Sequence, residues 1–174
     1  MTKKFNLFFF FIFFSSLVFS QEIDKRNSSI SFEISNMLVN TVEGSFSGFT
    51  GEINFNENNL SQSQINVCID ASTVNTGIEK RDDHLRTKDF FHVEKYPKIC
   101  FTSTNIIRNN TGYFAEGQLE MHGVKKNVKI PLNYSNNTLL GSLVINRFDY
   151  EIGVDSGSFN IGKKVYISIK CVLM

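Results

Sequence analysis

The sequence lacks the short motifs that mark several large classes of enzyme. It contains no C-x-x-C, no G-x-S-x-G, no H-E-x-x-H and no glycine-rich loop of the kind that cradles phosphates. These absences argue against thiol–disulfide exchange, serine hydrolysis, zinc-peptidase chemistry and nucleotide binding. A long helical pattern and an internal repeat are also missing, so no helical domain is expected.

The chain has no excess of charge of either sign. Its 18 Lys and Arg residues and 17 Asp and Glu residues give a formal charge of +1, and loss of residues 1–20, which carry Lys3, Lys4 and no acid, would change it to −1. A near-neutral chain has no broad electrostatic attraction to nucleic acid or to an anionic membrane. Nucleic acid is therefore not an expected partner.

Cysteine is also scarce, and the three cysteines all fall in predicted strands. Cys68 and Cys100 can form a disulfide if their strands are neighbours, whereas Cys171 lies near the end of the chain. Buried free thiols, which act as small apolar side chains, account for the same positions equally well. The sequence leaves both arrangements open.

The first twenty residues have the pattern of a secretory signal peptide. Lys3 and Lys4 precede a short apolar run at residues 7–14, and Val18 and Ser20 suit a cleavage site before Gln21. The apolar run is shorter than the about 20 residues that a membrane-spanning helix needs. We therefore expect a cleaved signal peptide at residues 1–20, one domain at residues 21–174, and a periplasmic or secreted mature protein.

From Ser28 onward the apolar residues recur with a period of two. In residues 30–34 isoleucine and phenylalanine alternate with serine and glutamate, and the same alternation returns in several later segments separated by Asn- and Gly-rich turns. Many short strands with one apolar and one polar face predict an all-β antiparallel barrel or sandwich. Residues 113–121, 128–134 and 165–173 are the clearest of these strands.

One stretch, residues 71–101, interrupts the strands and organises the rest of the chain. It combines a turn at Asn75–Gly77, a charged run at residues 79–84 and the pair Phe90–Phe91 before Tyr96–Pro97 leads into a new strand. Adjacent phenylalanines among so many charges suit a segment that covers the mouth of an apolar interior. The sequence predicts a lid of short helix and loop at about residues 75–97.

The same stretch resembles the YceI-like family of polyisoprenoid-binding proteins. The matching pattern is T-G-x-x-x-R-D-x-H-L, then D-F-F and Y-P-x-I-x-F, and further matches lie at Gly44–Phe46, Phe49–Gly51, Gly117–Val124 and Ile145–Ile152. This resemblance implies an eight-stranded antiparallel lipocalin-like β-barrel with an elongated internal cavity. It also implies that the cavity holds an isoprenoid.

The chain departs from the family pattern at three places, which comprise four residues. Asn36 stands where the family often has a histidine, Asn127 replaces a usual proline, and Tyr150-Glu151 replaces Phe-Gly. The missing histidine argues against chemistry by a histidine cluster. The acids and histidines at residues 82–84, 92 and 94 also lack the ligand spacing of a zinc site, so neither a metal nor a cofactor is expected.

The predicted ligand contacts come from the inward face of the strands and from the lid. A guanidinium at the polar end would suit a pyrophosphate or carboxylate head group, because it donates two parallel hydrogen bonds; Arg81 and Asp82 holding the lid through loop partners, Arg147 among them, is the structural alternative. The predicted ligand-binding residues are Phe46, Phe49, Arg81, His84, Phe90, Phe91, Leu119, Met121, Ile130, Leu132, Arg147 and Ile169.

The predicted function is an exported carrier or store that holds an isoprenoid or similar long-chain amphiphile without changing it. Two alternatives stay open: an enzyme acting on such a lipid through Asp82 and His84, and a ligand-free barrel that works by protein contacts. Fatty acids and amides fit the residue pattern as well as isoprenoids do. A homodimer and a transient contact with a membrane also remain open.

Overall fold

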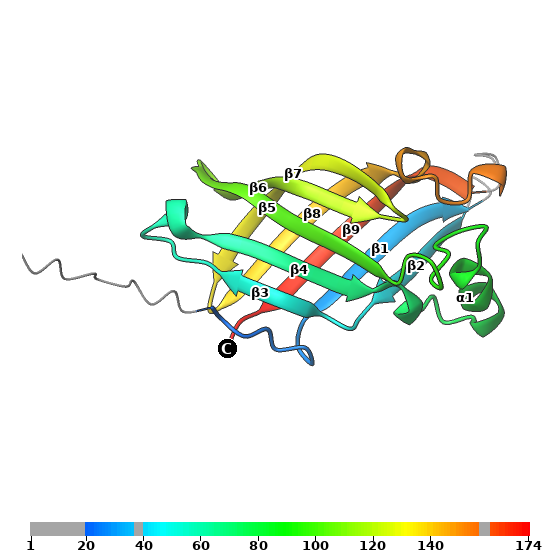
Figure 1. Ribbon diagram of the computed structural model, residues 1–174, viewed down its shortest axis with the longest axis horizontal. Helices are drawn as coiled ribbons and strands as arrows, with labels where there is room; N and C mark the ends of the chain where they lie inside the picture. The colour runs from blue at the N-terminus through cyan, green and yellow to red at the C-terminus, as the bar shows by residue number, and fades with distance from the viewer. Residues whose placement is uncertain (1–19, 37–39, 157–160) are drawn as a thin grey trace, which may run out of the picture.

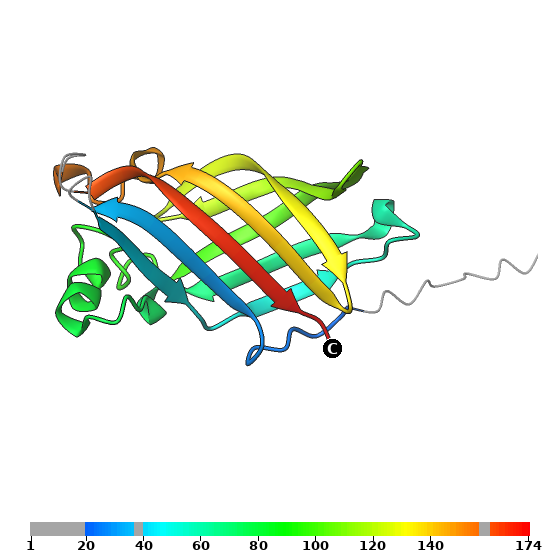
Figure 2. The same cartoon turned by 180° about the vertical axis from the view of Figure 1, so that it is seen from behind.

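The computed structural model describes residues 20–36, 40–156 and 161–174, which form one antiparallel sheet of nine strands. The order across the sheet is β2-β1-β9-β8-β7-β6-β5-β4-β3. The strands are β1 (Ser29–Asn36), β2 (Asn40–Phe46), β3 (Thr50–Asn54), β4 (Gln64–Asp70), β5 (Lys98–Asn109), β6 (Gly112–Met121), β7 (Val124–Ser135), β8 (Thr138–Asn146) and β9 (Ile161–Val172). Figures 1 and 2 show that the sheet curls on itself, with its strands tilted around a common interior.

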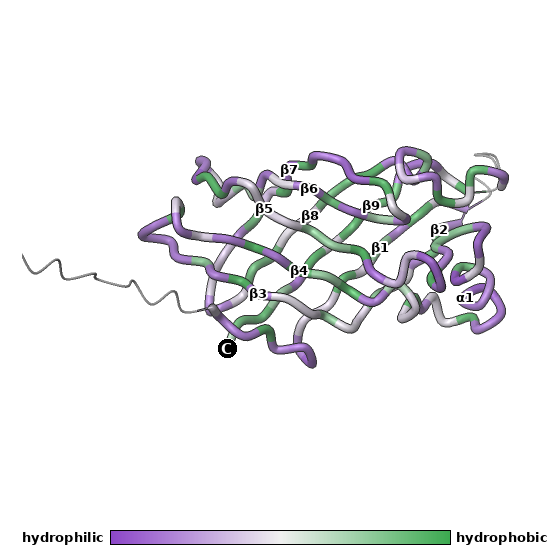
Figure 3. Tube along the Cα trace, viewed as in Figure 1, coloured by the Kyte–Doolittle hydropathy of each residue, from purple (hydrophilic) through white to green (hydrophobic). Residues whose placement is uncertain are grey.

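The alternation of apolar and polar residues decides which face of the sheet turns inward. In β9, Val165, Ile167 and Ile169 face the interior, whereas Tyr166 between them is 54% exposed on the outside. Figure 3 shows the same alternation of apolar and polar positions along the tilted strands. Successive side chains of a strand point to opposite faces, so the apolar half of each strand is buried together. The all-β antiparallel architecture predicted from the sequence is confirmed.

The predicted number of strands, eight, is wrong by one. β2 and β3 follow each other along the chain and lie at opposite edges of the sheet. Gly48 adopts a positive φ of 75° between them, a conformation that glycine accepts at little cost. The chain therefore leaves one edge of the curled sheet and joins the other within three residues.

Short bridges tie the two edges of the sheet to neighbouring segments. Gln21 pairs with Ile53 of β3 and Ile23 pairs with Leu173 just after β9, so residues 21–23 lie between these strands. At the opposite end of the molecule, Ser45 of β2 pairs with Asn75. These contacts satisfy backbone groups that an open sheet edge would leave unpaired.

The predicted short helix of the lid is confirmed as α1 (Glu79–Arg86), which lies with its flanking loops across one end of the curled sheet (Figure 1). The described residues also form four short 3-10 helices: η1 (Leu60–Gln62), η2 (Ala71–Thr73), η3 (Arg147–Tyr150) and η4 (Val154–Ser156). No helix within the described residues is long and apolar enough to cross a bilayer. The predicted signal peptide falls almost wholly outside the described residues.

The cysteines, left open by the sequence, are resolved by the strand register. Cys68 of β4 and Cys100 of β5 are directly opposite each other, with Cα atoms 4.1 Å apart, and form a disulfide. The bond joins two neighbouring strands of the cavity wall. Cys171 is a buried free thiol, and its burial raises the pKa to about 11.

Candidate functional site

The interior of the curled sheet contains a cavity of about 420 Å³. Its wall includes inward-facing side chains from all nine strands or their ends and from the lid, and nearly all of them are apolar. Volumes of about 300–1,000 Å³ are typical of sites that hold small molecules. The interior is therefore a binding-sized space rather than a filled core.

The structure brings every residue predicted to contact a ligand to the wall of this cavity. They lie at the end of β2 and just after it (Phe46, Phe49), on α1 (Arg81, His84), in the loop after α1 (Phe90, Phe91), on β6 (Leu119, Met121), on β7 (Ile130, Leu132), at the start of η3 (Arg147) and on β9 (Ile169).

The sequence prediction omitted other residues of the same wall. They include Ile30 and Phe32 of β1, Leu143 and Ile145 of β8, and Ile167 of β9. Each has the parity of an inward-facing position in its own strand, so the period of two already contained the signal. The prediction selected only some of the inward-facing residues, so their omission does not contradict the period-two pattern.

The end of the cavity away from the lid is closed by packed aromatic side chains. Phe55 contacts the rings of Tyr113 and Tyr134 at centroid distances of 5.0 and 4.8 Å. The Tyr113 hydroxyl donates to a Glu57 carboxylate oxygen at 2.6 Å, which raises the pKa of Tyr113. Phe55 and Tyr113 are buried, and neither lines the cavity, so this end acts as a plug.

The lid closes the other end with aromatic contacts of its own. The Phe91 ring packs edge-on against Phe46 at 5.3 Å, and the Phe90 ring packs edge-on against His84 at 5.1 Å. A Cβ atom at Gly153, next to η4, would meet the Phe90 ring at 2.5 Å, so this loop and the lid are in close contact. The lid therefore presents the rings of Phe90 and Phe91 to the cavity, together with Arg81 and His84 of α1.

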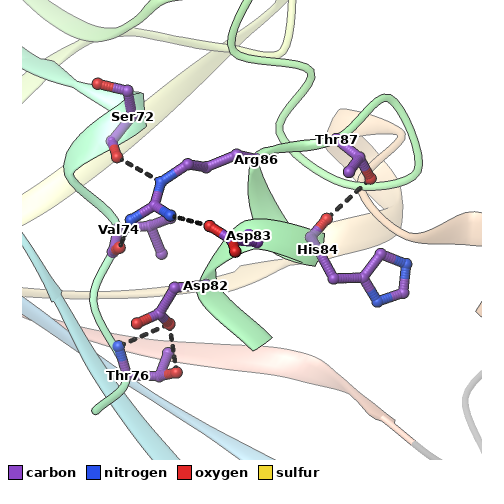
Figure 4. A network of polar contacts seen from close by, with 8 residues as sticks. All are labelled: Ser72, Val74, Thr76, Asp82, Asp83, His84, Arg86 and Thr87. Atoms are coloured by element: carbon purple, nitrogen blue, oxygen red, sulfur yellow. Dashed lines mark hydrogen bonds and ion pairs between the residues drawn. The ribbon is translucent and has the colours of Figure 1, made fainter. Parts of the chain in front are cut away.

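Hydrogen bonds to the preceding loop fix the position of α1 (Figure 4). The Arg86 guanidinium donates to the carbonyl oxygens of Ser72 and Val74 at 2.7 and 3.0 Å and to the Asp83 carboxylate at 2.8 Å. On the next turn, the buried Asp82 carboxylate accepts from the backbone N–H and the hydroxyl of Thr76. Through these bonds Asp82 and Arg86 anchor α1 to the loop at residues 72–76.

Asp82 and His84, the pair considered for catalysis, have separate partners. Asp82 bonds to Thr76, whereas His84 Nε2 lies 3.4 Å from an Asp89 carboxylate oxygen. In Figure 4 the two side chains point away from each other. A general acid–base pair needs its members within hydrogen-bond reach of one another or of a shared reacting group. The described residues also contain no group of three or more histidine, cysteine or acidic side chains that could hold a metal.

Arg147 is a buried cation whose guanidinium organises the loop between β8 and β9. Its side chain is 3% exposed and stacks on the Phe148 ring at 4.2 Å. Its nitrogens donate to backbone carbonyl oxygens of Ile152, Gly153, Ile161 and Gly162, at 2.7 Å for Ile152 and 2.9 Å for Gly162. Burial lowers the pKa of Arg147. These bonds show a structural role for Arg147 at the edge of the cavity.

We expect Arg147→Met to lower the free energy of unfolding by about 2–3 kcal/mol, because it keeps the apolar stem and leaves buried carbonyl oxygens without their charged donor. Urea denaturation would measure the change. Lys163→Met is the matched control, since Lys163 is an exposed cation that faces the same Phe148 ring. Lys163→Met is expected to change the free energy of unfolding by no more than about 0.5 kcal/mol. Equal effects of the two substitutions would contradict the structural role of Arg147.

Comparison with known proteins identifies the family. Residues 21–173, nearly the whole chain, match the YceI-like domain. The chain belongs to the YceI-like family. A UPF0312 protein of Yersinia enterocolitica is 36% identical over 118 residues, which cover 67% of this chain and 62% of that protein. A UPF0312 protein of Photorhabdus laumondii is 36% identical over 107 residues, which cover 62% of this chain and 56% of that protein. The match thus spans less than two thirds of the length of these relatives.

Solved structures show the same fold at lower identity. Burkholderia cenocepacia BcnA superposes with a TM-score of 0.79 at 22% identity, covering 86% of this YceI-like chain and 98% of that one. A polyisoprenoid-binding domain from Saccharophagus degradans, implicated in plant cell wall breakdown, superposes with a TM-score of 0.64 at 20% identity, covering 90% and 97%. The resemblance predicted from the lid motif is therefore confirmed.

Proposed function

We propose that this YceI-like protein is an exported lipid-binding protein that holds one isoprenoid or similar long-chain amphiphile in its cavity and does not change it chemically. The observation that carries the proposal is the cavity of about 420 Å³ with an apolar wall. Its lining runs along β9 from Ile161 to Cys171, which corresponds to about 33 Å of strand. Because the strands are tilted, the cavity itself is shorter than this stretch of strand, and an elongated space of this volume suits a single extended chain.

The energetics favour a long-chain ligand. Each methylene group moved from water into the cavity contributes about 0.8 kcal/mol. About ten buried carbons therefore supply up to about 8 kcal/mol, which corresponds to micromolar affinity. No directional chemistry is needed along the tail, so the chain length and the head group determine specificity.

Two further observations support export and binding without turnover. The Cys68–Cys100 disulfide is typical of proteins in oxidising compartments, which supports a periplasmic or secreted location. The separate partners of Asp82 and His84 favour a binding protein over an enzyme. The polyisoprenoid-binding domain of Saccharophagus degradans shares the fold and supports an isoprenoid as the ligand class.

The test is mass spectrometry of an organic extract of the mature protein, purified from its native host without detergent. We expect one isoprenoid chain per protein molecule, and we expect delipidated protein to take up farnesol again in a titration. A different stoichiometric lipid would overturn the isoprenoid assignment and retain the cavity's role. No extracted lipid and no uptake of farnesol or palmitic acid would overturn the proposed function.

A further inference from the structure

At the end of the sheet away from the lid, the inward-facing positions of the strands continue beyond the cavity wall. Ile53 of β3 lines the cavity, and the next inward position after it is Phe55. In the same way, Leu132 of β7 lines the cavity and is followed by Tyr134. Figure 1 shows that the loop after β3 lies at the end of the sheet opposite α1. Since inward positions alternate along a strand, the cavity ends on the rings of Phe55 and Tyr134.

Three aromatic residues form the plug at this end: Phe55, Tyr113 and Tyr134. The ring planes of Phe55 and Tyr113 are 89° apart, an edge-on contact at 5.0 Å, and the Tyr134 ring lies 4.8 Å from that of Phe55. Phe55 and Tyr113 are each 4% exposed. Closely packed side chains leave no space for a further carbon chain between them. The three rings, which come from three separate strands or their ends, therefore close this end of the cavity.

Glu57 holds the plug from its outer side. Its carboxylate accepts the hydrogen bond of the Tyr113 hydroxyl, and its backbone carbonyl oxygen accepts a hydrogen bond from Arg108 Nη2 at 3.0 Å. The Arg108 guanidinium also lies over the Tyr113 ring, 4.9 Å from its centroid. These contacts join residues 55–57 to the hairpin of β5 and β6. The Tyr113 ring cannot turn away from the cavity without breaking its bond to Glu57, so the plug is a fixed stop.

We propose that the plug sets the longest tail that the protein binds, so that the protein selects amphiphiles by tail length. A methylene group is about as large as a water molecule, which takes about 30 Å³ of the liquid, so the cavity of about 420 Å³ holds about 14 such groups. A longer tail would have to displace the plug or leave carbons in water. The inference rests on the proposed lipid-binding function and adds to it the residues that determine tail length.

The test measures affinity against tail length in two series of ligands. Saturated fatty acids from decanoic to eicosanoic acid form one series, and geraniol, farnesol and geranylgeraniol form the other. Isothermal titration at mildly alkaline pH, below each critical micelle concentration, gives the dissociation constants.

We expect each added methylene to raise the affinity about fourfold until the tail reaches the plug. This limit should fall at about 14–16 carbons, with no further gain beyond it. Among the isoprenols, farnesol should bind more tightly than geraniol, and geranylgeraniol should bind no more tightly than farnesol.

Substitutions should move this limit in both directions. Phe55→Ala and Tyr134→Ala each remove a ring from the plug and should move the limit by about three carbons towards longer tails. Leu139→Trp enlarges a wall residue that is paired with Tyr134, and it should move the limit by about two carbons towards shorter tails. Phe114→Ala is the matched control, because it removes a ring from the outer face of β6, where Lys129 lies over it. The control should leave the limit unchanged, and thermal melting verifies that each variant is folded.

Other outcomes would overturn the inference. An affinity that rises at the same rate up to eicosanoic acid would show that the plug does not limit the tail. A limit that stays in place in the folded plug variants, or an equal shift in Phe114→Ala, would also contradict the role of the plug while lipid binding stands. Tyr134 is only partly buried, so Tyr134→Ala serves if Phe55→Ala does not fold. Failure of both series to bind at any length would overturn the proposed function itself.

Discussion

Substitution of Ile167 by tryptophan is expected to weaken lipid binding at least about 100-fold. Ile167 lines the cavity from β9, directly opposite Leu143 of β8. An indole ring in this narrow space would exclude roughly four methylene groups of a ligand tail. At about 0.8 kcal/mol for each methylene, the loss of about 3 kcal/mol corresponds to a factor of about 100 in the dissociation constant.

The neighbouring residue supplies a matched control. Tyr166 is on the same strand, faces Val144 and Glu33 on the outer surface, and is 54% exposed. Tyr166→Trp introduces the same ring one residue away on the opposite face of the sheet, so its effect on binding should be less than twofold. Since successive residues of a strand point to opposite faces, the pair isolates the cavity from every other effect of the substitution.

The protein contains no tryptophan, so each variant carries a single indole reporter. We expect blue-shifted emission from Ile167→Trp and red-shifted, water-like emission from Tyr166→Trp, which verifies where each ring lies. Ligand affinity is measured by titration of palmitic acid and farnesol, with thermal melting as the folding check. Unchanged affinity in a folded Ile167→Trp with blue-shifted emission would show that the ligand does not use this cavity.

Removal of the Cys68–Cys100 disulfide is expected to lower the free energy of unfolding by about 3–4 kcal/mol. The two cysteines are 32 positions apart and close a loop that contains the whole lid. Cross-linking a loop of this length reduces the chain entropy of the unfolded state by about that amount at 25 °C. For a domain of this size the loss corresponds to a decrease of about 10 °C in the melting temperature.

The double variant Cys68→Ala/Cys100→Ala, with calorimetry, measures this effect, and Cys171→Ala is the control because it removes a buried thiol that closes no loop. Ligand affinity of the double variant should stay within about threefold of wild type at 25 °C, because the bond acts mainly on the unfolded chain and α1 keeps its contacts with residues 72–76. Thiol titration of the denatured, unreduced protein should give one thiol per chain. Three thiols, or a shift in melting temperature below 2 °C, would contradict the prediction.

Much of the fold could be predicted because it depends on local alternation. The inward residues of β9 and β6, such as Ile169 and Leu119, follow from a period of two, and the lid follows from the charged run and the adjacent phenylalanines of residues 79–91. The eight strands implied by the family resemblance were one too few, and the alternation alone did not predict that β2 and β3, on either side of Gly48, lie at opposite edges of the sheet. A turn residue indicates that a strand ends, and it does not indicate which strand the chain joins next.

Non-local contacts account for what the sequence did not predict. The pairing of Gln21 with Ile53 joins segments that have no common pattern, and the pairing of Cys68 with Cys100 depends on the register between β4 and β5. Arg147 lies on the cavity wall, and the sequence did not predict that its donors also bond to the carbonyl oxygens of Ile152 in the loop before β9 and of Gly162 in β9. Every residue has a backbone carbonyl, so the residue types in the sequence do not indicate which carbonyl oxygens Arg147 would contact.

By itself, the sequence determined the all-β class, the apolar and polar faces of the strands and the position of the lid, because each depends on residues close together in the chain. Only the tertiary structure decided that the interior is a cavity and that Arg81 of the lid, held by Thr76, lies on its wall. The alternation of side chains along a strand predicts which residues face inward, whereas the volume that these residues enclose depends on how strongly the sheet curls. The direction of the Arg81 guanidinium depends in turn on its hydrogen bonds to Thr76, and the position of Thr76 is set by the packing of the lid against the sheet.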